Sequence, residues 1–193
     1  MDNKSEVSLI DVDLKRFKEK IYDKYLKLFP ISERKPYKLI EKMVNKGITK
    51  IWGITDNNII VGFMIVNKVK NNTCIHLDYF AIFQEYQSKG YGTKAIKQLV
   101  NKYPKHYKIF IEIEKVGEGK NKQENEIREK RAKFYERLGF SKMNFDIYLY
   151  GVTYSAYILN YCNDDLENIK KDIYKIYNEI LGNIRMKLHC KFI

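Results

Sequence analysis

Hydrophobic residues recur every three to four positions in two segments near the N-terminus, and this spacing predicts two amphipathic helices. The first covers 11–29, with Asp11 or Asp13 available as its N-cap and a proline at its end. A proline-bounded connector at 29–36 leads to the second helix. Gly47 follows that helix, where a residue of left-handed conformation is expected to close it.

Alternating or continuous apolar runs predict seven strands, at 5–10, 48–55, 59–69, 74–83, 107–114, 140–150 and 152–161. Two more helices are predicted at 93–102 and 126–138, with a mobile surface loop at 116–124. This order of helices and strands predicts an α+β fold.

A final helix is predicted at 164–182, opened by Asp164 and Glu167 as a capping box. Its apolar residues share one face and are Leu166, Ile169, Ile173, Ile176 and Ile180. This stripe must be buried, either on the parent sheet or in a homodimer. We therefore divide the chain into a main domain, 1–161, and a C-terminal helical extension, 162–193, packed on that domain or on a partner.

Composition places the chain among globular proteins. It has 193 residues, of which 45% are hydrophobic and 14% aromatic, which argues against intrinsic disorder. No apolar run approaches the ~20 residues of a membrane span, and the polar N-terminus does not resemble a signal peptide. Cys74, Cys162 and Cys190 match no metal-ligand spacing, so no metal is expected. Unpaired cysteines fit a reducing compartment, and the cytoplasm is the predicted location.

The formal net charge of +12 is concentrated around one segment. Between Phe83 and Phe110 there are six lysines and only one acid, Glu85. Such a patch suits a ligand with several phosphates, and nucleic acid is the alternative partner.

A glycine-containing loop lies inside this patch. Gln87–Thr93 carries two glycines one residue apart and joins a predicted strand to a predicted helix. Glycines at such a junction let the backbone curl, so that successive N–H groups point into one concavity at the positive end of the helix. The sequence therefore predicts a phosphate or pyrophosphate site, with an ordinary turn as the alternative.

Two motifs resemble those of the GNAT superfamily of N-acetyltransferases. The family pattern Gln/Arg-x-x-Gly-x-Gly/Ala is matched by Gln87–Gly92, and the pattern Tyr-x-x-x-Gly-Phe by Tyr135–Phe140. The strand at 77–82 and the connector at 29–36 are also similar to those of small bacterial members. The resemblance implies the GNAT fold, a mixed central sheet with splayed parallel strands flanked by helices.

The resemblance further implies acetyl-CoA as donor and an amine, of a small molecule or a protein, as acceptor. In this family the loop amides bind the CoA pyrophosphate, and the preceding strand pairs with the pantetheine arm. The implied cofactor-binding residues are Phe80, Ala81, Ile82, Gln87, Ser88, Lys89, Gly90, Tyr91, Gly92, Thr93 and Arg128. Arg128 stands where many relatives have asparagine, and it either meets a CoA phosphate or lies on a solvated helix face.

The same resemblance implies a tyrosine that protonates the departing thiolate, and Tyr135 falls at that position. Alternatively, its ring packs under the sheet while its hydroxyl holds the CoA sulfur. His76, Asp78 and Glu112 are the candidate bases for the amine proton, and they could instead bind a cationic acceptor. A non-catalytic CoA-binding sensor of the same fold is the alternative function.

Overall fold

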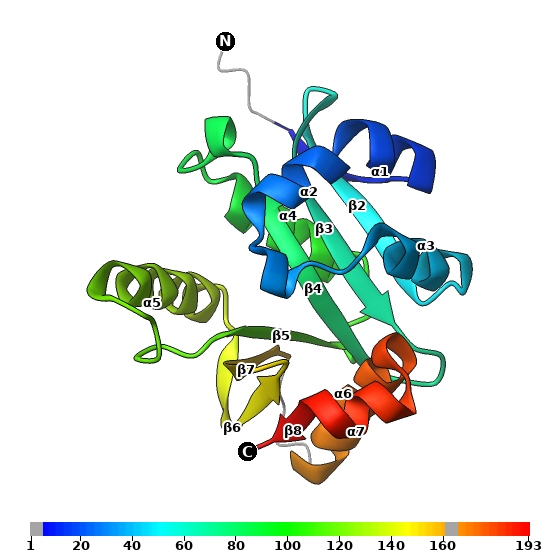
Figure 1. The fold of residues 1–193 in the computed structure, drawn as a ribbon. Coiled ribbons are helices and arrows are strands. Elements are labelled where there is room, and N and C mark those ends of the chain that lie inside the picture. The colour runs from blue at the N-terminus through cyan, green and yellow to red at the C-terminus, as the bar shows by residue number, and fades with distance from the viewer. Residues whose placement is uncertain (1–5, 161–165) are drawn as a thin grey trace. The chain divides into compact units, whose positions relative to one another are not determined.

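The computed structural model describes residues 6–160 and 166–193, and it divides into two compact units (Figure 1). The first unit consists of Met1–Lys68 with Leu77–Pro104, and the second of Val69–His76 with Lys105–Ile193. Strand β4 (Cys74–Ile82) begins in the second unit and ends in the first.

In the first unit the strands follow the order β1-β2-β3-β4, and β1/β2 and β2/β3 pair antiparallel. The strands besides β4 are β1 (Val7–Asp11), β2 (Thr49–Asp56) and β3 (Ile59–Lys68). The helices are α1 (Leu14–Lys20), α2 (Tyr22–Leu28), α3 (Tyr37–Asn45) and α4 (Tyr91–Asn101), with 3₁₀ turns η1 (Ile31–Glu33) and η2 (Gln84–Tyr86). Helix α4 contacts β1, whereas α1 and α2 cover the opposite face of the strands (Figure 1).

The helix predicted at 11–29 is in fact two helices, which meet at Ile21. Asp13 is the N-cap of α1, because its Oδ1 accepts a hydrogen bond of 2.7 Å from the Arg16 N–H. The break leaves the helical period intact, since Phe17, Ile21 and Tyr25 are all buried against the strands. The rings of Phe17 and Tyr25 contact each other, and Tyr25 also contacts Phe29 of the connector and Tyr79 of β4.

In the second unit the strands follow the order β4-β5-β7-β6-β8. Strand β4 pairs parallel with β5 from Cys74 to His76, and the remaining neighbours are antiparallel. The elements besides β4 are β5 (Lys108–Glu114), α5 (Lys122–Arg137), β6 (Ser141–Leu149), β7 (Val152–Leu159), α6 (Leu166–Leu181), α7 (Asn183–His189) and β8 (Cys190–Phe192). The α+β fold with a mixed parallel and antiparallel sheet flanked by helices is confirmed.

The C-terminal segment packs within the second unit. The apolar face of α6 is buried against Phe110, Ile147 and Ile158, which come from three neighbouring strands. Helix α7 and strand β8 were not predicted, and β8 adds to the sheet by pairing with β6. The expected Asp164 cap and Cys162 lie outside the described residues. The domain boundary at 161/162 and the homodimer stay predictions.

Helix α5 begins at Lys122, four residues before the start predicted from the apolar pattern. Asn121 caps it by accepting from the Glu124 N–H at 2.8 Å. The side chain of Asn125 then folds back, and its Oδ1 accepts from the N–H groups of Gly117 and Gly119. Much of the predicted surface loop is therefore a helix start and a hydrogen-bonded turn.

None of the helices in the described ranges 6–160 and 166–193 is long and apolar enough to span a bilayer.

Candidate functional site

The glycine loop adopts a backbone that presents amide groups. Ser88 and Gly90 both have positive φ, 61° and 78°, and the residues around them are extended or helical. Gly90 is the N-cap of α4 and provides no side chain to satisfy the N–H groups of the first turn. A Cβ at Gly90 would meet nothing within 4 Å, so the space over the loop is open. This is the geometry of an anion site at a helix N-terminus.

Two side chains predicted to bind the ligand contact main-chain groups at the loop. Gln87 Nε2 donates a 3.1 Å hydrogen bond to the Ile82 carbonyl, and Lys89 Nζ donates one of 3.0 Å to the Glu85 carbonyl. The first of these contacts ties the loop to the end of β4. Their predicted role as phosphate ligands stays a prediction, and the backbone amides are the groups that the conformation exposes.

The end of β4 lies unusually close to β3. The Ala81 carbonyl oxygen would be 2.4 Å from a Cβ built on Gly62, a separation that real side chains do not tolerate. Beyond it, the Phe83 N–H donates to the Val61 carbonyl at 2.9 Å. Gly62 therefore sets the path of the strand segment predicted to pair with pantetheine, and glycine is the residue that allows it.

Asp78 is held in an ion pair. Both of its carboxylate oxygens accept from Lys35 Nζ, at 2.6 and 2.8 Å, and Oδ2 also accepts from Asn67 Nδ2 at 3.0 Å. Its side chain is only 6% exposed. Main-chain contacts strengthen the same link, because Tyr79 Oη donates to the Glu33 carbonyl at 2.6 Å. Asp78 thus anchors the connector to β4.

His76 and Glu112 come together in the second unit. Nε2 of His76 lies 2.6 Å from Oε2 of Glu112. An ionised carboxylate can only accept, so Nε2 carries the proton of this hydrogen bond. The imidazole is fully buried between the rings of Phe110 and Tyr177, at centroid distances of 5.1 and 5.6 Å. The carboxylate side chain is 11% exposed, and it is the member of the pair that solvent reaches.

Tyr135, in the last turns of α5, is buried among aromatic rings. Its ring makes edge contacts with Phe134 and Phe140. Burial raises the pKa of its hydroxyl to about 12, against the opposing charge of Arg131 and with a smaller upward contribution from Glu112. The hydroxyl is therefore protonated throughout the neutral range and acts as a donor.

Comparison with known proteins identifies the family. The family model for the acetyltransferase (GNAT) domain matches residues 47–142, which contain the glycine loop, both carboxylates and Tyr135. The chain belongs to the GNAT superfamily. No curated protein matches it.

Among solved structures, a protein assigned to the GNAT family from Bacteroides thetaiotaomicron superposes with a TM-score of 0.74 at 20% identity, covering 91% of this chain and 98% of that one. A Bacillus subtilis acetyltransferase in complex with CoA gives 0.55 at 13% identity, covering 81% and 100%. The ribosomal-protein-S18-alanine N-acetyltransferase from Escherichia coli gives 0.58 at 16% identity, covering 83% and 99%. At these identities the likeness concerns the fold.

Arg128 does not lie on a solvated helix face, which was one of its two expected positions. It is 6% exposed, and its NH2 group lies 2.8 Å from carboxylate oxygens of both Glu114 and Glu124. Its NH1 donates to the Lys115 carbonyl at 2.9 Å. Arg128 thus links α5 to β5, and a contact with CoA stays a prediction.

Two residues that pack against the candidate site residues were missed by sequence reasoning. Gly62 lies inside an apolar strand, where an isolated glycine is itself a signal of close backbone approach. Tyr177 packs on His76 from α6, and its spacing of four from Ile173 places it on the buried face of that helix. Both signals were present in the sequence.

Proposed function

We propose that the protein is an N-acetyltransferase that moves the acetyl group of acetyl-CoA to a primary amine, of a small molecule or a protein, by direct attack in a ternary complex. The observation that carries this proposal is the loop of two left-handed residues, Ser88 and Gly90, opening α4 without a capping side chain. Membership in the GNAT superfamily supports it, as does the CoA bound to a solved relative.

The donor is held mainly by main-chain groups. The N–H groups at the start of α4, helped by its dipole, receive the pyrophosphate. The segment Phe80–Ile82 pairs with the pantetheine arm as an added strand would. One of its N–H groups then donates to the thioester oxygen, where negative charge develops during the reaction.

Glu112 is the base that fits best among the three candidates. Asp78 has both oxygens engaged by Lys35, so accepting a proton there would break an ion pair. His76 is fully buried and reaches the substrate only through Glu112. Glu112 is partly exposed, and the imidazole fixes its orientation. We therefore assign Glu112 as proton acceptor and His76 as its positioning residue.

Tyr135 serves the leaving group. A thiol has an ordinary pKa of about 8.5, so complete proton transfer from a phenol of pKa about 12 would be uphill by roughly 5 kcal/mol. A hydrogen bond to the departing sulfur carries no such cost. Tyr135 therefore acts as a donor that stabilises the developing thiolate.

The chemical step is nucleophilic attack of the amine on the thioester. Glu112 takes a proton from the substrate ammonium, and the amine lone pair forms the C–N bond at the thioester carbon. The carbonyl electrons move to oxygen, which the main-chain N–H stabilises. As they return, the C–S bond breaks and its electrons leave on the sulfur, next to Tyr135. After attack the nitrogen still carries a second proton and a positive charge. That proton passes through solvent to the thiolate, which leaves a neutral amide and CoA as a free thiol, and the proton held by Glu112 is released to solvent.

Donor binding and turnover can be tested separately. Acetyl-CoA at millimolar concentration is expected to raise the melting temperature, because it binds the folded state. Release of free thiol with a panel of amines then measures transfer. A missing thermal shift would refute the donor site. A shift without thiol release for every amine would favour the CoA-binding sensor.

Replacement of Tyr135 by Phe is expected to lower kcat by about ten- to a hundredfold, the equivalent of one hydrogen bond to a charged group. Acetyl-CoA affinity should change little. Tyr148→Phe, which removes an exposed hydroxyl in the same unit, is the matched control. Equal kcat values for the two variants would remove Tyr135 from the mechanism.

Replacement of Glu112 by Gln keeps an oxygen that accepts from His76 and removes the base. We expect kcat/KM at neutral pH to fall by about a hundredfold. The deficit should shrink as pH rises, because free amine then forms without the enzyme. A deficit that is constant across pH would contradict the role of base.

A further inference from the structure

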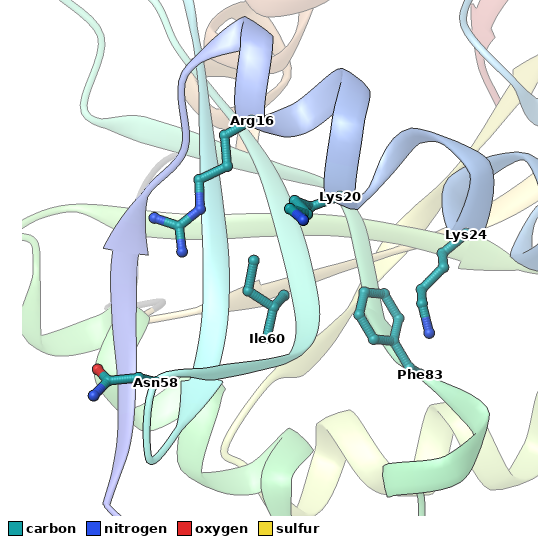
Figure 2. A pocket seen from close by; sticks show the side chains of 6 residues that line it. All are labelled: Arg16, Lys20, Lys24, Asn58, Ile60 and Phe83. Carbon is teal, nitrogen blue, oxygen red and sulfur yellow. The ribbon is translucent and has the colours of Figure 1, made fainter.

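A groove in the first unit is lined by cationic side chains, and none of its lining residues belongs to the predicted CoA-binding set (Figure 2). Its volume is about 320 Å³, and its lining consists of Arg16, Lys20, Lys24, Asn58, Ile60 and Phe83. Three of these side chains are cationic, and no carboxylate appears among the described residues of the lining. The groove is thus basic along one side, with an apolar floor.

The cations occupy one face of two consecutive helices. Positions 16, 20 and 24 are four residues apart, and the change of helix at Ile21 does not interrupt this register. Like charges at this spacing repel one another, so α1 and α2 are more stable when an anion lies between them. Figure 2 shows Arg16 and Lys24 extending from these helices toward the hairpin turn and the Phe83 ring.

The three cations differ in how they are engaged. Lys24 Nζ lies 2.7 Å from Glu85 Oε1 and 4.2 Å from the centroid of the Phe83 ring, so it is held at the edge of the groove. Within the parts of the chain that the structure describes, Arg16 and Lys20 have no carboxylate partner for their side chains. Their charge is therefore available to a ligand.

The chemistry of this set matches a phosphate group. A guanidinium offers paired donors that suit two phosphate oxygens, and an ammonium adds a point charge. Asn58, in the left-handed conformation with φ of 67°, places an amide at the far wall. Ile60 and Phe83 provide an apolar surface for the carbon part of the ligand. We propose that this groove binds the phosphate group of a small organic ligand.

Two sources of that phosphate have the same chemistry. Glu85, the partner of Lys24, lies in η2, two residues before Gln87 and the glycine loop. The pair of Lys24 and Glu85 therefore links the groove to the segment that leads into the glycine loop, within the same unit. Its phosphate is either the 3′-phosphate of CoA itself or that of a separate molecule, such as a phosphorylated acceptor.

The first test is calorimetric titration of inorganic pyrophosphate into the full chain saturated with dephospho-CoA, which occupies the proposed pyrophosphate loop at the start of α4. The groove variant is Arg16→Gln/Lys20→Gln, and the matched control Lys15→Gln/Lys27→Gln removes the same charge from α1 and α2 outside the groove. All four positions are exposed, so folding should be retained. We expect at least a tenfold loss of affinity in the groove variant and less than a twofold loss in the control. No binding, or equal losses, would overturn the proposal.

The second test distinguishes the two sources. Pyrophosphate is titrated into wild-type protein saturated with CoA or with dephospho-CoA, which lacks the 3′-phosphate. If CoA blocks the groove and dephospho-CoA leaves it open, the 3′-phosphate is the occupant. If pyrophosphate still binds the groove in the presence of either cofactor, the occupant is a separate phosphorylated molecule. If dephospho-CoA prevents pyrophosphate from binding, the groove is part of the pyrophosphate loop. The proposal of a distinct site then fails.

Discussion

Adding one methyl group to Gly62 should disturb the strand segment that we propose holds the donor. In the structure this residue lies in β3, directly beneath the Ala81 carbonyl of β4. A Cβ there would be 2.4 Å from that oxygen and 3.1 Å from the Ile82 Cα, whereas ordinary contact begins at 3.4 Å. Both neighbours are backbone atoms. A rotamer change cannot relieve the clash, so the end of β4 must move by about 1 Å.

The cost can be estimated from this displacement. Overpacking of a rigid site typically costs about 1–3 kcal/mol. For a chain of this size a loss of about 2 kcal/mol lowers the melting temperature by roughly 4–8 °C. A shift of the Phe80–Ile82 segment would also weaken one or two main-chain hydrogen bonds to pantetheine, at about 1 kcal/mol each. The Kd for acetyl-CoA should therefore rise about five- to thirtyfold.

Thermal or denaturant unfolding measures the first effect, and calorimetric titration of acetyl-CoA measures the second. Gly53→Ala is the matched control, because Gly53 lies on the neighbouring strand and its Cβ would meet only side-chain atoms of Val12 and Ile10, at 3.0 and 3.1 Å. It should lose less stability and keep its affinity. If Gly62→Ala loses stability but binds acetyl-CoA normally, the end of β4 does not contact the donor.

Two further predictions concern buried polar groups. Asp78→Asn should destabilise the protein by about 1–3 kcal/mol, because it leaves the ammonium group of its partner without a counter-charge, whereas Asp11→Asn in an exposed pair should cost less than about 1 kcal/mol; denaturant unfolding compares them. Burial raises the pKa values of Cys74 and Cys190 from 9.0 to about 12. Each should therefore react with thiol reagents at pH 8 about a thousandfold more slowly than an ordinary cysteine. Mass spectrometry of labelled peptides checks this, and rapid labelling of either residue in folded protein would contradict it.

Features decided within a few neighbouring residues were predictable from the sequence. Asp13 caps α1, and Gly47 has the positive φ, 70°, expected of a residue that closes a helix. The positive φ of Asn57 and Asn58 likewise fits a tight turn between the strands predicted at 48–55 and 59–69. These conformations depend on local sterics and hydrogen bonds, which the residue types themselves determine.

Features decided by distant residues were less predictable. The break at Ile21 escaped prediction because the apolar spacing continues through it. Strand β8 is only three residues long, and it exists because β6 offers it an edge. The alternation of side chains along a strand places every second residue of β4 on one face. It does not identify the residues with which they form hydrogen bonds or ion pairs. The lysine that engages Asp78 is 43 positions away, and the carboxylate beside His76 is 36 positions away.

Those partners give the acidic residues of the site different tasks. Asp78 accepts from the ammonium group of Lys35 and the amide of Asn67, and these contacts hold the connector on the strand. Glu112 faces the buried imidazole of His76, and its own side chain is 11% exposed, so solvent reaches it. A proton arriving at Asp78 would break its contact with Lys35 and release the connector, whereas the contact between Glu112 and His76 holds no part of the connector. The lysine partner therefore gives Asp78 a structural role, and Glu112 is the carboxylate that we propose takes the proton.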